Sequence, residues 1–118
     1  MPKKVSTRLT RINDEIARVA ANIIRFEMAD PRIGAVVSVI RAEATPDLKF
    51  CKIYVSVLEE GSKRQATLEA LHKATGFFRK GIADSINLRN TPEITFVHDD
   101  SIEHAMRMHK LIDEVNKR

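Results

Sequence analysis

The pattern of one long amphipathic helix is interrupted near its centre by a glycine, Gly76. A glycine inside a helix costs about 1 kcal/mol relative to alanine, and the preceding Thr75 is a modest helix former, so local preference favours a bend. Lys73, Arg79 and Lys80 flank this point. A bend would present backbone amides and cationic side chains together, and that combination suits a phosphate group. Replacing Gly76 by alanine is accordingly expected to straighten the helix.

A second group of residues that could do chemistry consists of histidines and aspartates nearer the C-terminus. Asp100 and His104 are four residues apart, a spacing that could place two metal ligands on one helix face, and Asp99 is adjacent. Strand ends and helix caps account for the aspartates more simply, because an aspartate oxygen caps free backbone amides. We therefore expect no metal and no cofactor. The alternative is a metal-dependent hydrolase that uses Asp99, Asp100 and His104.

Nucleophilic catalysis has less support still. Cys51 lies in a strand-like run with no basic neighbour placed to activate its thiol. The chain contains neither a phosphate-binding P-loop nor a Gly-x-Gly-x-x-Gly dinucleotide motif. We expect no enzymatic activity. Because Cys51 is the only cysteine and no apolar run is long enough to span a membrane, the sequence indicates a cytoplasmic protein.

Composition indicates a small basic protein. The 118 residues, 43% of them hydrophobic, suffice for one compact core, so we expect a single domain over residues 1–118, with residues 1–5 a candidate disordered end. The net charge is +4, with +3 over residues 1–32 and +4 over residues 63–90. The rest is mildly acidic, so a basic face and an acidic face follow if the two basic segments lie side by side. An acidic face leaves a protein-binding adaptor as a further alternative.

Apolar spacing predicts the elements that position these residues. A three-four pattern predicts a first helix that begins at residue 6 or 7 and ends at residue 28, where Asp30-Pro31 stops it. Two strand-like runs, residues 36–44 and 50–58, are joined by a turn-forming Thr-Pro-Asp sequence and predict a β-hairpin. The second run alternates clearly between apolar and polar residues, whereas the first does not.

The second half of the chain predicts two helical stretches with a strand between them. A capping box at residues 62–65 should begin the kinked helix, which continues to about Leu88. A third strand is expected over residues 94–97, and a last helix begins at Asp100 or Ser101. Its apolar stripe comprises Ala105, Met108, Ile112 and Val115. The order of elements predicts an α+β fold in which the helices pack on a three-stranded mixed sheet and bury every apolar stripe.

Nucleic acid is the ligand that the basic segments favour. Six aromatic residues are too few for a base-stacking sheet of the RNA-recognition-motif type, and we expect Phe77 and Phe78 in the core. The remaining mode is recognition of the phosphate backbone by the kink and its basic neighbours. The candidate RNA-contacting residues are Lys73, Ala74, Thr75, Gly76, Arg79, Lys80 and Arg89. An equally compatible role for Gly76 is only to let two helices pack closely.

The first helix carries a second candidate set. Three arginines repeat every seven residues and form a cationic row away from the apolar stripe, and a fourth precedes them. A solvated helix face would have the same pattern, so the row does not by itself identify a binding surface. The residues are Arg8, Arg11, Arg18 and Arg25.

Several segments, in their order and spacing, match one known family. The most specific are Asp30-Pro31-Arg32-Ile33-Gly34, Ile53-Tyr54-Val55-Ser56, Ala74-Thr75-Gly76-Phe77-Phe78-Arg79, Pro92-Glu93-Ile94-Thr95-Phe96 and Asp99-Asp100-Ser101. In these segments the chain resembles ribosome-binding factor A, a family of bacterial ribosome-assembly proteins. The resemblance spans nearly the whole chain.

The resemblance implies a type-II KH-like fold, in which an Ala-x-Gly kink stands where other KH proteins carry a Gly-x-x-Gly loop that clamps RNA. Here the kink would be Ala74-Thr75-Gly76. The resemblance further implies binding to the immature 30S subunit and its 16S rRNA, support of late maturation and processing of that rRNA, release before translation, and importance in the cold. Nothing in the sequence requires more than a monomer.

Overall fold

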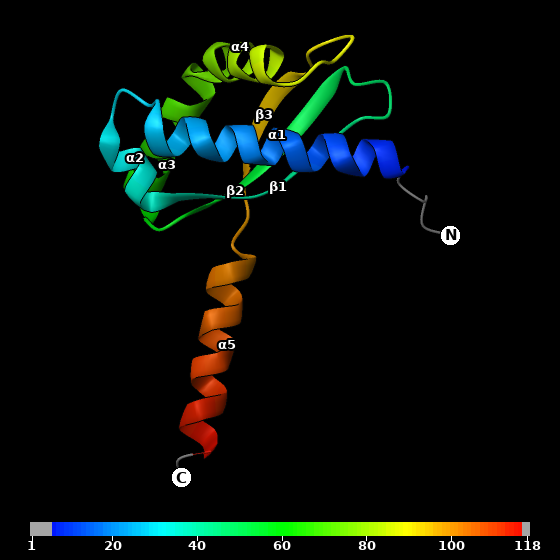
Figure 1. The fold of residues 1–118 in the computed structure, drawn as a ribbon. Helices are drawn as coiled ribbons and strands as arrows, with labels where there is room; N and C mark the ends of the chain where they lie inside the picture. The colour runs from blue at the N-terminus through cyan, green and yellow to red at the C-terminus, as the bar shows by residue number, and fades with distance from the viewer. Residues whose placement is uncertain (1–5, 117–118) are drawn as a thin grey trace.

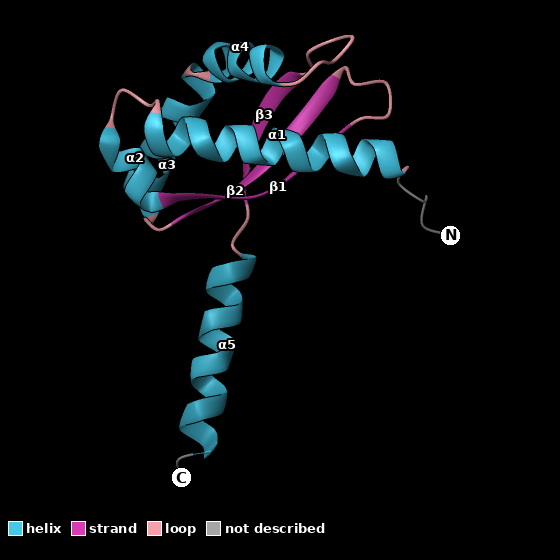
Figure 2. Cartoon of the chain, in the orientation of Figure 1, coloured by secondary structure: helices cyan, strands magenta, loops and turns pink. Residues whose placement is uncertain are grey.

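The computed structural model describes residues 6–116, so the expectation for residues 1–5 lies outside the described part. Two helices, two strands and two further helices follow one another along the chain, which then ends with a strand and a helix (Figures 1 and 2). The elements are α1 (Thr7–Phe26), α2 (Pro31–Val36), β1 (Val37–Ala44), β2 (Phe50–Val57), α3 (Gly61–Lys73), α4 (Thr75–Ser85), β3 (Glu93–His98) and α5 (Ser101–Asn116). The predicted α+β class and the order of elements are confirmed, with α2 as an additional short helix.

Helix α1 begins and packs as its sequence predicts. The Ser6 hydroxyl oxygen accepts a hydrogen bond from the Leu9 amide at 3.1 Å and caps the first turn. Ile16, Ala20 and Ile23 are buried along one stripe. The helix ends two residues earlier than predicted. The Asp30 carboxylate then caps α2 by accepting from the Arg32 amide at 2.9 Å, a cap that the sequence analysis took only as a stop.

The three strands form one mixed sheet in the order β1-β2-β3, with β1 antiparallel and β3 parallel to β2. In β2 the predicted alternation is confirmed over residues 50–55, where Cys51, Ile53 and Val55 are buried, but Ser56, expected on the more exposed face, is also buried. The pairing register of β1 shifts between Val39 and Arg41. This irregularity inserts one extra residue, which explains why the β1 sequence lacks a clear alternation.

Helices α1, α3 and α4 lie on one face of the sheet (Figure 1). Their apolar residues meet the strands in one core that includes Leu71, Phe78 and Ile82, all fully buried. The Phe78 ring packs edge-on against Phe96 of β3, with 4.9 Å between ring centroids. Because Leu71 of α3 and Phe78 of α4 are both anchored in this core, the α3–α4 junction between them has a defined position.

Both ends of the α3–α4 pair differ from the sequence expectation. Helix α3 begins at Gly61 after Glu60, and no side chain caps it, so the predicted capping box at residues 62–65 is wrong. Gly61 has φ +57°, a conformation that glycine adopts readily, and the chain can therefore turn into the helix two residues earlier than a cap at Ser62 would allow. Helix α4 ends at Ser85 and not at Leu88, because Ile86 is extended and buried in the core.

The expectation that every helix stripe is buried is wrong for α5. This helix extends away from the rest of the molecule (Figure 1), and Met108, Ile112 and Val115 are 47%, 53% and 68% exposed. Its first turn is held by Glu103, whose carboxylate pairs with the Arg64 guanidinium at 3.2 Å. Within residues 6–116, no helix is long and apolar enough to cross a membrane.

Candidate nucleic-acid interface

The bend between α3 and α4 lies at Ala74, two residues before the glycine that was predicted to cause it. Ala74 has φ −93° and ψ 6°, and its amide contacts two carbonyls of α3, those of Ala70 at 3.2 Å and Leu71 at 3.0 Å. The Thr75 hydroxyl donates to another α3 carbonyl at 3.0 Å. Gly76 lies in the first turn of α4. The predicted kink in the segment Ala74-Thr75-Gly76 is confirmed, with the bend at its first residue. Because the bend is not at Gly76 itself, the structure gives no support to the expectation that Gly76→Ala straightens the helix.

Close packing of two helices does not explain why a glycine stands at position 76. A Cβ at Gly76 would have no heavy atom within 4 Å beyond its own helical surroundings, whereas a Cβ at Gly81 would lie 2.6 Å from Cδ1 of Ile23 in α1. Gly81 therefore lets α4 pack closely against α1. Within residues 6–116 no side chain caps the first turn of α4, and the space beside Gly76 is open.

The cations beside the kink divide into two kinds. Lys73 and Lys80 are exposed and form no ion pair with any described residue. The Arg79 guanidinium donates instead to backbone carbonyls of the α4–β3 connection, from Nε to Pro92 at 3.1 Å and from Nη2 to Thr91 at 3.0 Å. Arg79 thus holds the entry to β3, and the two lysines are free to contact a ligand.

The two phenylalanines that follow Gly76 have different environments. Phe78 is fully buried, as predicted, but Phe77 is 47% exposed, so its expected place in the core is wrong. Successive helix residues are rotated by about 100°, and the core face of α4 contains Phe78 and Ile82 but not Phe77. The Phe77 side chain lines a groove between the kink and the α1–α2 connection.

Two of the predicted arginines meet at the opposite end of the helix layer. Arg8 at the start of α1 and Arg89 in the α4–β3 connection line one cleft of about 320 Å³ with the β1–β2 turn. Both are exposed. The Asp47 carboxylate also lines this cleft. The structure therefore brings Arg89 to the first-helix set and away from the kink to which the sequence analysis assigned it.

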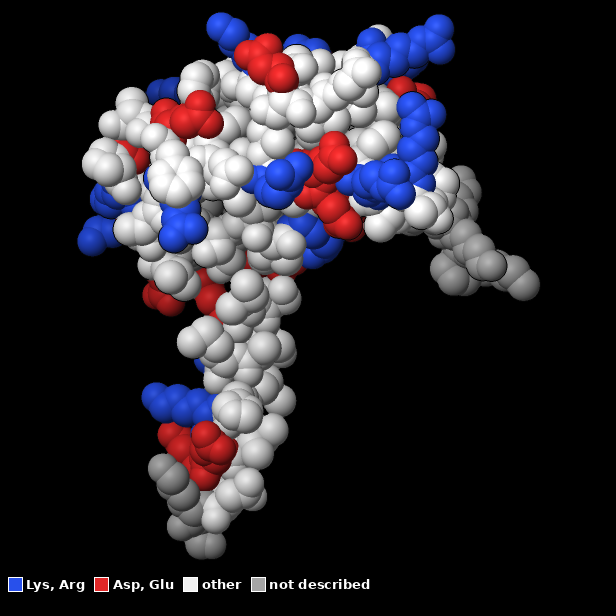
Figure 3. Space-filling view, in the orientation of Figure 1, with Lys and Arg blue, Asp and Glu red and all other residues white. Residues whose placement is uncertain are grey.

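The remaining arginines of α1 are exposed but do not form an unbroken basic face. Arg11, Arg18 and Arg25 lie on the outer side of the helix. The two basic segments do lie side by side, since α1 packs against α4. Figure 3 shows Lys and Arg side chains along this face, with Asp and Glu side chains between them. This face is therefore mixed in charge. Lys73 and Lys80 at the kink form a separate cationic group.

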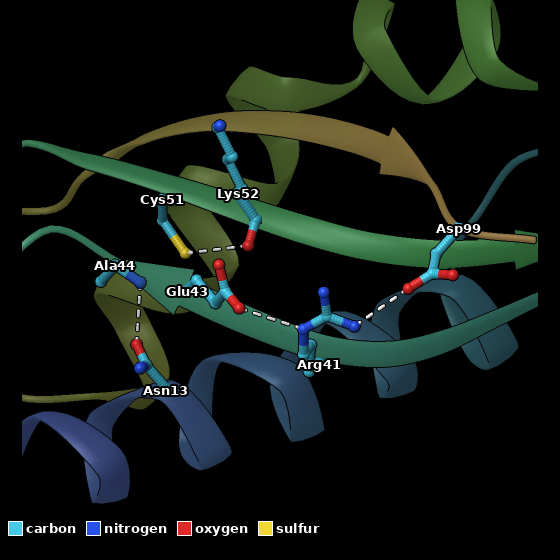
Figure 4. Close-up of polar contacts among 7 residues, drawn as sticks. All are labelled: Asn13, Arg41, Glu43, Ala44, Cys51, Lys52 and Asp99. Atoms are coloured by element: carbon cyan, nitrogen blue, oxygen red, sulfur yellow. Dashed lines mark hydrogen bonds and ion pairs between the residues drawn. The ribbon is translucent and has the colours of Figure 1, made fainter. Parts of the chain in front are cut away.

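The aspartates near the C-terminus have structural partners. The Asp99 carboxylate accepts a hydrogen bond from the Ser101 amide at 2.8 Å. It accepts another from Arg41 Nη1 at 3.0 Å (Figure 4). These bonds, first that from Ser101 and then that from Arg41, lower the pKa of Asp99 to about 2. Among the described residues, no group of three or more His, Cys, Asp or Glu side chains could hold a metal ion. This arrangement does not favour the hydrolase alternative.

Cys51 has the environment of a structural thiol. Its side chain is buried in β2, and burial raises the pKa of the thiol to about 11. Its Sγ lies 3.8 Å from the Lys52 carbonyl (Figure 4). The thiolate that nucleophilic chemistry needs is therefore disfavoured.

Several polar contacts around the sheet were not predicted from the sequence. The Ala44 amide donates to Asn13 Oδ1 at 2.9 Å, which ties the end of β1 to α1. The Arg41 guanidinium lies 3.9 Å from the centroid of the Tyr54 ring while it also contacts Asp99. The contact between Arg41 and Tyr54 depends on how β1 and β2 are paired. The sequence signal for it is the alternation of β2, which places Tyr54 on the face of the sheet away from the core.

Comparison with known proteins agrees with this geometry. The family model described as ribosome-binding factor A matches residues 8–112. The chain belongs to the ribosome-binding factor A family. It is 48% identical to ribosome-binding factor A of Lachnospira eligens, over 98% of this chain and 88% of the relative. It is 49% identical to that of Agathobacter rectalis, over 98% of this chain and 95% of the relative.

Solved structures of the family have the same fold. An NMR structure of a Thermotoga maritima protein, a putative ribosome binding factor A, is 32% identical and has a TM-score of 0.70 over 86% of this chain and 96% of that protein. The Thermus thermophilus crystal structure, 21% identical, has a TM-score of 0.68 over 76% and 94%. The family's KH-like fold, which the sequence resemblance implied, is confirmed.

Proposed function

We propose that this protein binds the immature small ribosomal subunit by contacting the phosphate backbone of 16S rRNA at the α3–α4 kink. The observation that carries the proposal is the open backbone at Gly76 between two exposed, unpaired lysines, Lys73 and Lys80. A helix start without a capping side chain favours an anion, and the lysines add charge on both sides of it. A model of the Thermus thermophilus factor fitted into a map of its 30S complex supports the same partner.

The residues of the proposed interface have separate roles. Lys73, Lys80 and the backbone at Thr75 and Gly76 contact phosphates, whereas Arg79 keeps the α4–β3 connection in place. The cleft at the other end, with Arg8 and Arg89, contacts a second part of the RNA. Arg11, Arg18 and Arg25 add to the long-range attraction of RNA, and the acidic side chains between them limit their contribution.

The biological role that we propose is that of a non-enzymatic assembly factor. The protein acts in the cytoplasm, as one KH-like domain and as a monomer, and supports late maturation and processing of 16S rRNA. It leaves the subunit before translation, and its role matters most in the cold. Membership in the ribosome-binding factor A family supports this proposal.

The experiment that tests the proposal is a binding measurement on immature small subunits at several salt concentrations. Each phosphate contact should contribute about 0.7–0.9 to the slope of log affinity against log salt. A variant with Lys73→Ala and Lys80→Ala should lower that slope by about 1.4–1.8. Lys52→Ala is the matched control, because Lys52 is an exposed lysine on β2. Equal slopes for the double variant and the control would contradict the proposed interface.

A further inference from the structure

We propose that the groove beside the kink receives one unstacked nucleobase, with the Phe77 ring as its stacking platform. This inference rests on the proposed function, because the base would belong to the rRNA that the kink contacts. The groove has a volume of about 470 Å³ and lies between residues 27–33 and residues 70–77. One wall includes Asp30 and Ile33 of the Asp-Pro-Arg-Ile-Gly segment, and the other includes Ala74 and Phe77 of the Ala-Thr-Gly-Phe-Phe segment.

The interior of the groove is suited to a flat apolar surface. Met28, Ile33 and Ala74 line it together with Phe77. The Phe77 ring is 47% exposed and stacks on no described aromatic or cationic side chain. Bases of single-stranded RNA stack on such aromatic side chains, and each stacked base has a π-face for this contact. A base in the groove would cover the exposed ring.

The charges at the groove favour a base over a phosphate inside it. The Glu27 and Asp30 carboxylates line one wall and would repel a phosphate, whereas they can accept hydrogen bonds from amino groups of a base. Asp30 Oδ1 accepts from the Arg32 amide at 2.9 Å, and Oδ2 forms an ion pair with the Arg32 guanidinium at 3.8 Å, a distance too long for a hydrogen bond. Uracil offers such a carboxylate only its ring N3–H and no exocyclic amino group, so the groove should favour adenine, cytosine or guanine over uracil.

The surroundings of the groove can accommodate the RNA backbone on either side of the inserted base. Lys73 lines the opposite wall and can contact the phosphate next to the inserted base. Gly76 adds no side chain beside Phe77, so the RNA backbone can approach the first turn of α4 closely. The same kink therefore contacts the phosphate while the groove contacts the base.

A fluorescence experiment tests base insertion directly. The chain has no tryptophan, so Phe77→Trp places a single reporter at the wall of the groove. Its emission should be quenched when immature small subunits are added. Short oligonucleotides of A, C or G should quench it at lower concentrations than an oligonucleotide of U. Equal quenching by all four would contradict the selectivity for an amino group, and no quenching by RNA or subunits would contradict base insertion.

A binding experiment separates this inference from the proposed function. Phe77→Ala should weaken binding to immature subunits and to naked 16S rRNA by about fivefold to a hundredfold, the range for one stacked base. The salt slope should stay unchanged, because no phosphate contact is removed. Phe50→Ala is the matched control, since Phe50 is 56% exposed on β2 and lies outside the groove. It should bind like the wild type.

Each remaining outcome decides one of the two ideas. If the wild type binds with the expected salt dependence and Phe77→Ala equals Phe50→Ala, base insertion is wrong and the proposed function stands. If Phe77→Ala weakens binding to subunits but not to naked rRNA, the groove binds a ribosomal protein and base insertion is wrong. If the wild type binds neither subunits nor rRNA, the proposed function itself fails.

Discussion

Gly81 of α4 and Ile23 of α1 touch so closely that a Cβ at Gly81 would lie 2.6 Å from Cδ1 of Ile23. Ile23 is 2% exposed, so its terminal methyl group has no free space at the surface into which to move. This contact fixes α4 against α1 and thereby positions the kink. Two glycines five residues apart thus have different roles, with Gly81 required for packing and Gly76 open to solvent.

Gly81→Ala should lower the free energy of unfolding by about 1–2 kcal/mol, because the added methyl group overpacks the contact with Ile23. Chemical denaturation measures this change. Ile23→Val removes Cδ1 and should cost about 0.5–1.5 kcal/mol in the wild type but clearly less in the Gly81→Ala background. Strictly additive effects in this double-mutant cycle would show that the two residues do not compete for space.

Gly76→Ala should leave the fold intact and raise the free energy of unfolding by up to about 1 kcal/mol, since alanine is the better helix former and its Cβ meets nothing. The same Cβ would stand where the RNA backbone approaches, so affinity for immature subunits should fall. Denaturation and subunit binding of the one variant test both parts. Wild-type affinity together with higher stability would remove Gly76 from the interface.

Arg79→Ala should mainly lower stability and Lys80→Ala should mainly lower affinity for the subunit, although the two residues are adjacent. Loss of the two Arg79 hydrogen bonds to the Thr91 and Pro92 carbonyls should lower the free energy of unfolding by about 1–2 kcal/mol. Lys80→Ala should change stability by less than about 0.5 kcal/mol but reduce the affinity for subunits. Both variants are assayed for unfolding by denaturant and for binding to immature subunits. A lower free energy of unfolding for Lys80→Ala than for Arg79→Ala would contradict this division of roles.

The contribution of Asp99 to stability should depend on pH. Its pKa is about 2 in the folded protein, below the ordinary value of 3.8, so the folded state favours the ionised carboxylate. The stabilisation is therefore present above about pH 4 and disappears as the pH falls through the folded-state pKa. Asp99→Asn should be less stable than the wild type at neutral pH, and the difference should shrink towards pH 2. A difference that is constant over this range would show that ionisation of Asp99 is unimportant.

The parts of the fold that the sequence predicted correctly have strong local patterns. The stripe of α1, its start at Thr7 and the alternation over most of β2 follow from residue types and spacing alone. The errors occur where tertiary contacts decide: the burial of Ile86 ends α4 early, and the stripe of α5 has the spacing of a buried helix but is exposed. Periodicity shows that a helix has an apolar face but does not show what covers it.

The candidate site was predicted in part for the same reason. Flanking cations and a glycine located the kink, but only the structure distinguishes the free Lys73 and Lys80 from the engaged Arg79. Arg8 and Arg89 are close because the start of α1, the β1–β2 turn and the α4–β3 connection meet in the fold. Local sequence patterns do not predict such a tertiary contact. The exposure of Phe77 follows from which face of α4 meets the sheet.

The central claim, that the kink contacts rRNA, is tested most directly by site-specific cross-linking. A photo-reactive amino acid at position 80, beside the kink, and one at position 52, on β2, would be compared on immature small subunits. We predict rRNA cross-links from position 80 and none from position 52. Cross-links to rRNA from position 52 alone, or only to ribosomal protein from position 80, would contradict the proposed interface.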